Sequence, residues 1–378
     1  MGMKGKLIFC LVAMFSAAFW PLHVFAATPK NSAQSAVLVN QDSGSILYAK
    51  NENEHHAIAS TTKIMTAFLT LEAAEEQNRE ITVTPEMIRV EGSSMGLRVG
   101  NRLTLHDLAV GMMMVSGNDA ANAAAIAIGG STERFAAMMN AKAASLGMSN
   151  THFVTPSGLD DTEHYSTARD MAVLACAAMQ NSDFASIVRQ KSMKIHFLNP
   201  DEIHSYGNHN KLLQFYPSCT GIKTGFTKKA GRCLVSAAEK DGVRLVAVTL
   251  DDPDDWNDHE ALLDYGFSQL KSQKIDDSSC RLEENVVGGI EPFVTVSGTE
   301  GEKIVIGSSD HLTRTVELPQ FLYAPVKTGQ VVGCVRYDCG GKTVARTELV
   351  AEENVARAVM PKNWFQVFWD GLKRLLFG

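Results

Sequence analysis

The stretch Ser60-Thr61-Thr62-Lys63 places a hydroxyl and an amine three residues apart at the start of an apolar segment. Because residues three apart lie on one face of a helix, we expect the Lys63 amine within reach of the Ser60 hydroxyl. Serine is a poor nucleophile until a neighbouring base removes its proton, and a desolvated lysine can be that base. A helix N-cap followed by a surface lysine has the same pattern, so the rest of the chain decides its meaning.

Two further polar elements follow in the chain, Ser116-Gly117-Asn118 and Lys223-Thr224-Gly225. They add a second hydroxyl, an amide and a second amine to the set that Ser60-x-x-Lys63 begins. A lone K-T-G means little, because Lys327-Thr328-Gly329 repeats the triplet without partner elements and is predicted to be a turn. The prediction of a serine-nucleophile site therefore depends on all three elements occurring together and in this order.

The composition indicates an ordinary globular protein long enough for two domains and a large core. The chain has 378 residues, of which 45% are hydrophobic and 20% charged. A net charge of −7 and a pI near 5.9 give no electrostatic case for binding nucleic acid. The Cys and His residues do not have structural-zinc spacing, and we expect no metal and no cofactor.

Residues 1–26 are predicted to be a signal peptide. Lys4 and Lys6 precede an apolar run from Leu7 to Trp20 that is too short to span a bilayer comfortably, and Val24-Phe25-Ala26 offers a cleavage site before Ala27. A retained anchor is the alternative. Export to an oxidising compartment permits disulfides. Cys219 and Cys233 flank the K-T-G element, so they are predicted either to form a bridge or to remain free thiols.

The expected elements alternate in a way that predicts an α/β domain with an inserted helical lobe over residues 27–273. A strand hairpin is expected at Ser35–Tyr48 and another around Asp241-Gly242, joining Leu234–Glu239 to Arg244–Leu250. Periodicity between and after them predicts helices at Thr61–Ala74, Leu105–Val115, Asp119–Ile128, Thr132–Leu146, Ser166–Asn181 and Asn257–Gln273. The stretch Phe153–Tyr165 is predicted to be a loop.

The sequence pattern changes over the last hundred residues. Short alternating apolar runs separated by turn residues predict a small all-β domain over residues 274–358. Its expected strands are Asn285–Val287, Phe293–Val296, Lys303–Ile306, Thr313–Leu318 and Val331–Tyr337. Residues 359–378 are predicted to form an amphipathic helix that lies in a membrane interface. A helix packed on the β domain is the alternative.

With these elements in place, the chain resembles the serine-type D-alanyl-D-alanine carboxypeptidases, which are low-molecular-mass penicillin-binding proteins. The resemblance covers essentially all of the mature chain. It includes the stretches Ala59–Ala67, Ser116–Ala120, Asn150–Phe153, Gly158–Asp160, Ser166–Met171 and Asn208–Leu213. It implies a β-lactamase/transpeptidase-like catalytic domain followed by a small β domain and an amphipathic tail. Together, the predicted signal peptide and the amphipathic tail predict an exported enzyme attached to the outer face of the cytoplasmic membrane.

The resemblance implies a role for each polar element. Ser60 is the expected nucleophile toward peptidoglycan stem peptides ending in D-Ala-D-Ala and toward β-lactam antibiotics. Lys63 is its expected base, and Ser116 relays a proton to the leaving amine. The expected substrate-binding residues are Asn118, Lys223, Thr224 and Gly225. The backbone N–H groups of Ser60 and Phe226 are the expected oxyanion hole.

Departures from the family and rival functions remain open at this point. Ile58-Ala59 replaces a Pro-Ala pair of many relatives, and Phe226 replaces a His of some. His55-His56 suggests a metal, although a solvated loop is the expected reading. A β-lactamase-like hydrolase would need a group that activates the deacylating water, for which Glu163 has no supporting pattern. A non-catalytic wall-binding protein is the other rival, and endopeptidase or transpeptidase activity remains possible.

Overall fold

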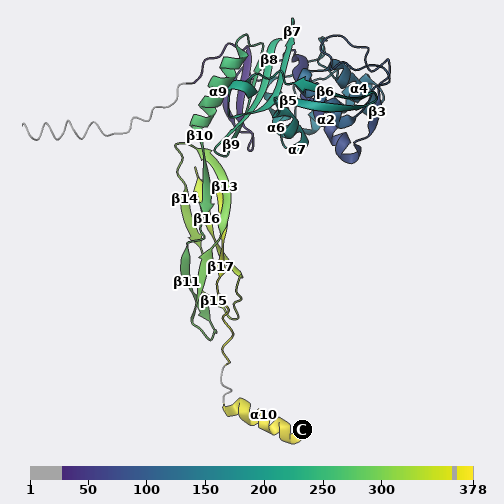
Figure 1. The fold of residues 1–378 in the computed structure, drawn as a ribbon. Coiled ribbons are helices and arrows are strands. Elements are labelled where there is room, and N and C mark those ends of the chain that lie inside the picture. The colour runs from purple at the N-terminus through teal and green to yellow at the C-terminus, as the bar shows by residue number, and fades with distance from the viewer. Residues whose placement is uncertain (1–27, 360–363, 378) are drawn as a thin grey trace, which may run out of the picture.

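A computed structural model of the chain describes residues 28–359 and 364–377, so the predicted signal peptide lies outside the described residues. The chain forms two bodies and a terminal helix (Figure 1). A mixed α/β domain comes first, an elongated β domain follows it, and helix α10 (Trp364–Phe377) lies beyond the far end of the β domain. This is the mixed fold class that the sequence predicts.

An antiparallel five-stranded sheet organises the first domain, with strand order β2-β1-β9-β8-β7. The strands are β1 (Ser35–Asn40), β2 (Ile46–Lys50), β7 (Cys219–Thr227), β8 (Gly231–Lys240) and β9 (Val243–Leu250). Both predicted hairpins are confirmed, since β1 pairs with β2 and β8 pairs with β9. Every residue of β1 is buried, because helices cover both faces of the sheet. Strand β7 is an edge strand.

A helical lobe covers one face of this sheet, and α8 and α9 cover the other. The lobe consists of η2 (Ala59–Thr62), α2 (Lys63–Gln77), α3 (Leu105–Val115), α4 (Asn118–Gly129), α5 (Thr132–Ser145), α6 (Ala168–Ala178) and α7 (Ser182–Val188). The opposite face carries α8 (Leu212–Phe215) and α9 (Asp255–Gln269). Small hairpins β3–β4 (Glu80–Thr82, Arg102–Thr104) and β5–β6 (Ser192–Leu198, Asp201–Gly207) complete the lobe.

All the predicted helices are present, and two of them end at least three residues earlier than expected. The helix expected at Ser166–Asn181 ends at Ala178, because the Asn181 side chain accepts the Phe184 N–H and starts the separate helix α7. The helix expected at Asn257–Gln273 ends at Gln269. The next residues form β10 (Leu270–Asp276), which pairs with the distant strand β13 (Glu300–Gly307). This long-range pairing overrides the local helical pattern.

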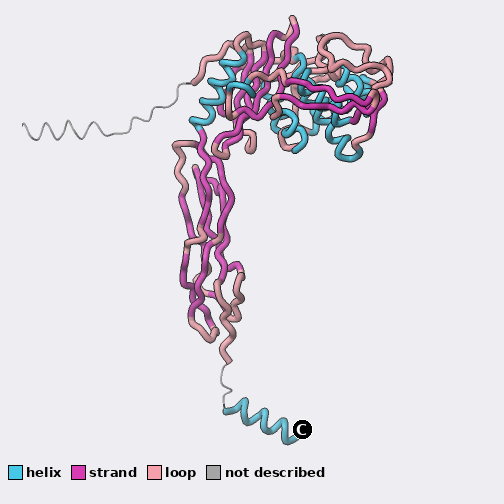
Figure 2. Tube along the Cα trace, in the orientation of Figure 1, coloured by secondary structure: helices cyan, strands magenta, loops and turns pink. Residues whose placement is uncertain are grey.

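The β domain contains all five strands expected from the sequence, here β11 (Arg281–Val287), β12 (Phe293–Gly298), β13, β14 (Thr313–Glu317) and β16 (Val331–Cys339). The strands β15 (Leu322–Tyr323) and β17 (Lys342–Ala351) were not expected. A six-stranded sheet in the order β14-β16-β17-β12-β11-β15 packs beside the β10–β13 pair. Figure 2 shows that this domain consists of strands joined by loops. Its core is separate from the two cores that flank the sheet of the first domain.

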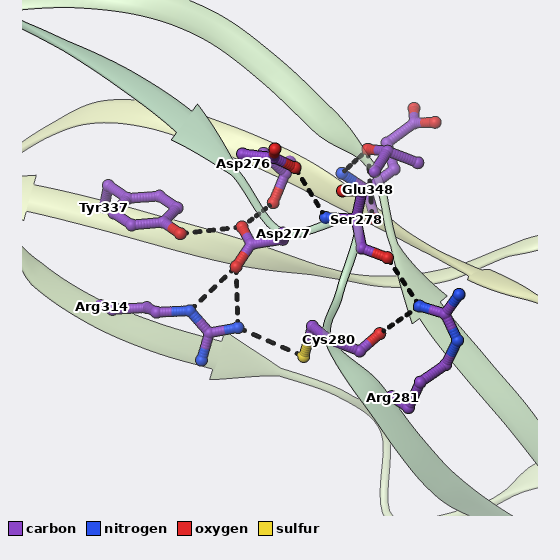
Figure 3. Close-up of polar contacts among 10 residues, drawn as sticks. Asp276, Asp277, Ser278, Cys280, Arg281, Arg314, Tyr337 and Glu348 are labelled. Atoms are coloured by element: carbon purple, nitrogen blue, oxygen red, sulfur yellow. Dashed lines mark hydrogen bonds and ion pairs between the residues drawn. The ribbon is translucent and has the colours of Figure 1, made fainter.

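A buried carboxylate ties the entry of the β domain to its later strands (Figure 3). Asp277, just after β10, accepts hydrogen bonds from Arg314, Tyr337 and Thr347 on β14, β16 and β17. The Arg314 Nη2 atom also donates to the Cys280 Sγ atom, 3.3 Å away. Burial opposes ionisation of Asp277, but the hydrogen bonds prevail and hold its pKa below the usual range. Four segments of the β domain therefore meet at one charge.

Helix α10 exposes a set of large apolar side chains to solvent, namely Phe365, Val367, Phe368, Trp369, Leu375, Leu376 and Phe377. Lys373 and Arg374 lie among them along the helix. Within the described residues no single helix is long and apolar enough to cross a bilayer, and α6 with α7 qualifies only as a pair bent by 109°.

Candidate active site

Ser60 lies in a tight 3-10 turn that leads directly into helix α2. The turn begins with Ala59 at φ +46°, a left-handed conformation that is uncommon for a residue with a β-carbon. The buried Ile58 carbonyl accepts both the Thr61 N–H at 3.2 Å and the Thr61 hydroxyl at 2.5 Å. The expected helix therefore begins at Lys63 rather than Thr61, and a stiff turn presents the candidate nucleophile Ser60.

Lys63 is fully buried and contacts the candidate nucleophile. Its Nζ atom donates to the Ser60 Oγ atom at 2.9 Å and to the Ser157 carbonyl at 2.7 Å. Burial and the nearby Lys223 charge hold the pKa of Lys63 well below its ordinary value, and Asp119 opposes this only in part. The neutral amine is a competent base for the Ser60 proton.

The loop after α5 holds Lys63 in place. Besides the Ser157 carbonyl, Thr66 donates to the Pro156 carbonyl at 2.6 Å, and Thr62 Oγ1 lies 2.8 Å from His164 Nε2. Burial lowers the pKa of His164 to about 4, so this ring is neutral at physiological pH. The sequence predicted the loop but assigned no role to Ser157 or His164.

The second element, Ser116-Gly117-Asn118, has one side chain in the cavity and one outside it. Ser116 ends α3 in a left-handed conformation (φ 59°), is buried and lines the same cavity as Ser60. The Asn118 side chain instead donates to the Glu91 carbonyl at 2.6 Å and does not line that cavity. Asp119 accepts the N–H groups of Met95, Gly96 and Leu97. In this structure Asn118 and Asp119 hold the loop before β4.

The third element lies on the edge strand β7, beside the turn that carries Ser60. A β-carbon on Gly225 would lie 3.1 Å from the Ile58 carbonyl and from the N–H groups of Ser60 and Thr61. Glycine therefore lets β7 approach the turn that carries Ser60. Lys223 is buried, donates to the Thr224 carbonyl at 2.8 Å, and has its pKa lowered by burial to about 7.

These elements surround an open cavity of about 350 Å³. Its lining residues are Ser60, Ser93, Ser116, His209, Lys211, Thr224, Gly225, Phe226, Arg232, Asp255 and Trp256. The structure thus brings Ser60, Ser116, Thr224, Gly225 and Phe226 together around one space. His209 and Lys211 come from the stretch Asn208–Leu213, which resembled the family but had received no role.

One cation at the rim was not expected from the sequence. Arg232, on β8, donates to the Asp255 carboxylate at 2.6 Å and lies over the Trp256 ring, 5.5 Å from its centre. The Arg232 Nε atom is buried and has no hydrogen-bond partner within the described part of the chain. Only the register of β7 against β8, which pairs Arg232 with Phe226, brings it to the site.

The histidines and cysteines near the site make contacts within the fold and form no metal site among the described residues. His55 stacks on Tyr165, and His56 Nε2 lies 2.8 Å from the Ser35 hydroxyl. No group of three or more His, Cys, Asp or Glu residues in the described ranges is placed to hold a metal ion. Cys219 and Cys233 are free and buried, and they pair with Ala238 and Gly225 at different positions along the β7–β8 ladder. The predicted disulfide bond between Cys219 and Cys233 is therefore wrong, and the alternative of free thiols holds.

Comparison with known proteins agrees with this geometry. Residues 23–254 match the family model described as D-alanyl-D-alanine carboxypeptidase, and residues 291–357 match the model described as penicillin-binding protein 5, C-terminal domain. The chain is 32% identical to D-alanyl-D-alanine carboxypeptidase DacF of Bacillus subtilis, covering 87% of each chain. It is 37% identical to DacB2 of Mycobacterium tuberculosis, covering 64% of this chain and 84% of the relative.

A solved structure shows the same architecture. Penicillin-binding protein 5 from Haemophilus influenzae superposes with a TM-score of 0.63 at 29% identity, covering 88% of this chain and 100% of that one. The first family model alone spans more than half of the sequence. The chain therefore belongs to the D-alanyl-D-alanine carboxypeptidase family and is a hydrolase of the serine-peptidase class, as its sequence motifs implied.

Proposed function

We propose that this enzyme removes the terminal D-alanine from peptidoglycan stem peptides through an acyl-enzyme on Ser60. The observation that carries the proposal is the 2.9 Å contact between the Ser60 hydroxyl and the buried Lys63 amine. A buried amine with a lowered pKa accepts the serine proton without a histidine. The serine oxygen then attacks the carbonyl of the penultimate residue.

The remaining groups fit the later steps of this reaction. Ser116 shares the cavity with Ser60 and is placed to relay the proton to the leaving D-alanine amine. The N–H groups of Ser60 and Phe226 are the proposed donors to the carbonyl oxygen, as β7 approaches the Ser60 turn at Gly225. Water then hydrolyses the ester on Ser60 and releases the shortened peptide.

The free carboxylate of the substrate explains the cations of the cavity. Lys211 and Arg232 line it, and the single carboxylate among the lining residues, Asp255, is already paired with Arg232. Lys223 and Thr224 are proposed to bind the terminal carboxylate. Since β7 is an edge strand, its unpaired side is available to an extended substrate backbone. Asn118 joins the substrate site only if its side chain leaves the Glu91 carbonyl.

Intact-mass spectrometry of the enzyme with penicillin tests this proposal, with Ser60→Ala as the control. A stable adduct of the drug mass on the wild type alone is expected. Rapid drug hydrolysis without an adduct would favour a β-lactamase, although Glu163 is exposed and does not line the cavity. Neither adduct nor hydrolysis would favour a non-catalytic wall-binding protein. Release of D-alanine from a pentapeptide would then distinguish carboxypeptidase from endopeptidase activity.

We also propose that the chain is exported after cleavage of residues 1–26 and held on the outer face of the cytoplasmic membrane by residues 359–378. The exposed apolar side chains of α10 support this anchor. In this arrangement residues 27–273 form the catalytic domain, and residues 274–358 form the spacer between it and the lipid. Deletion of residues 364–378 is expected to release active enzyme from membranes. A truncated enzyme that still sediments with membranes would refute the anchor.

A further inference from the structure

The end of the β domain farthest from the active site exposes a second set of large apolar side chains. Together they form what we call the distal patch. Its members are Val287 (48% exposed), Ile290 (63%), Phe293 (51%), Phe321 (40%) and Tyr323 (71%). They belong to β11, β12, β15 and the segments beside them, and Figure 1 places β11 and β15 at the α10 end of the molecule. Exposed apolar side chains gathered in this way indicate a binding surface.

Strand register brings three of these side chains onto one side of the sheet. Val287 lies opposite Tyr323 in the parallel β11–β15 pair, and Asn285 lies opposite Phe293 in the antiparallel β11–β12 pair. Because alternate residues of a strand face the same side, Val287, Phe293 and Tyr323 share one face. The Phe321 ring contacts the Tyr323 ring at 5.2 Å between centres.

The patch is also tied to the segment that leads into α10. The Ile290 N–H donates to the Ala356 carbonyl, and the Ala358 N–H donates to the Gly288 carbonyl, each at 2.9 Å. Five residue steps separate Val359 from Trp364, and an extended chain covers at most about 18 Å over that length. The first residue of α10 therefore lies within about 18 Å of Val359, which directly follows the segment bonded to the patch.

We propose that the distal patch is a second membrane-binding surface, which rests on the lipid bilayer beside α10. The proposal rests on the membrane attachment of α10 proposed above. Tyrosine and phenylalanine beside aliphatic side chains suit the interfacial region of a bilayer. Glu291 and Arg357 flank the patch with opposite charges, so apolar burial is the expected driving force and salt has little effect. Two attachment points would set the β domain upright and fix the height of the catalytic cavity above the lipid.

Vesicle binding of the mature chain tests the patch separately from α10. The probe is a vesicle of phosphatidylethanolamine and phosphatidylglycerol, and the variant is Ile290→Ser/Phe293→Ser/Tyr323→Ser. The matched control is Val99→Ser/Ile203→Ser/Phe215→Ser, which removes exposed apolar side chains from the catalytic domain. We expect the patch variant to bind vesicles about tenfold more weakly than the wild type and the control to bind equally well.

Hydrogen exchange supplies the second readout. The backbone N–H groups of residues 287–293 and 321–323 are expected to exchange more slowly when vesicles are added. The Ser60→Ala enzyme should show the same protection, because lipid binding does not depend on the proposed catalytic serine. If the patch variant binds like the wild type and these residues gain no protection, the patch is not a lipid surface, while loss of binding on deletion of α10 would still support the anchor. Protection that appears with protein concentration in the absence of vesicles would assign the patch to a second copy of the chain and overturn the proposal.

Discussion

Gly158 packs so closely against the nucleophile turn that a β-carbon at this position would lie 1.9 Å from the Ala59 carbonyl oxygen. The same β-carbon would lie 2.6 Å from Thr62 Oγ1, and Gly158 itself has a left-handed backbone at φ +80°. The Ser157 carbonyl of this loop accepts a hydrogen bond from the Lys63 amine. The same loop therefore positions Lys63 and also limits the position of Ser60. Close packing, rather than a further hydrogen bond, sets the geometry of the turn.

Gly158→Ala is therefore expected to displace Ser60 from Lys63 and to slow acylation by penicillin roughly 10²-fold, as small displacements of reacting groups do. Gly147→Ala is the matched control, since Gly147 has φ +79° with no atom within 4 Å of its β-carbon. That control bears only the backbone strain, about 1–2 kcal/mol. Equal acylation rates in the two variants would show that the contact with Ala59 is unimportant.

Lys63 should make acylation depend on pH in one direction. The neutral amine is the proposed base, so the rate is expected to rise with pH until the lowered pKa of Lys63 is passed. Lys63→Arg keeps the positive charge but cannot lose its proton, and it is expected to slow acylation by about 10²–10⁴-fold. Stopped-flow acylation of both proteins over a pH series is the measurement. A Lys63→Arg enzyme as fast as the wild type would exclude Lys63 as the base.

Lys223 should couple the binding of a carboxylate to proton uptake. Its amine has a pKa of about 7 in the free enzyme, and a bound carboxylate favours the charged form. Affinity for a D-Ala-D-Ala peptide is therefore expected to fall as pH rises above about 7, by up to tenfold per unit. Calorimetry on the Ser60→Ala enzyme measures this without turnover. The C-terminally amidated peptide is the control, and it should lose the dependence; an equal slope for both peptides would contradict the assignment.

Asp277 should dominate the stability of the β domain. Asp277→Ala leaves Arg314, Tyr337 and Thr347 without their shared acceptor, at a cost of about 3 kcal/mol in the free energy of unfolding. The exposed Asp276→Ala is the control and should change stability little. Because the folded-state pKa of Asp277 is lowered, its contribution is full above about pH 4 and is lost as pH falls through the folded value. Thermal melts that show the same difference from the wild type at pH 3 and pH 7 would contradict this.

Local pattern was enough to predict the fold class, both hairpins of the first sheet, most helices and five strands of the β domain. These features depend on periodicity and turn residues that are close together in the chain. The Ser60–Lys63 contact was predicted for the same reason, since one helical turn joins the two residues. Local pattern also extended the helix α9 wrongly from Gln269 to Gln273. Residues 270–276 instead form β10, which pairs with β13, and no local signal in the sequence joins these two segments.

The sequence by itself determined the family and predicted the nucleophile and its base, because short motifs and their order carry that information. Only the tertiary structure decided which distant groups meet them. It turned the Asn118 side chain toward Glu91, left Cys219 and Cys233 unbridged, and brought Arg232 to the rim of the cavity. The physical reason is that strand register and side-chain packing join residues that are far apart in the chain, and no local pattern specifies those pairings.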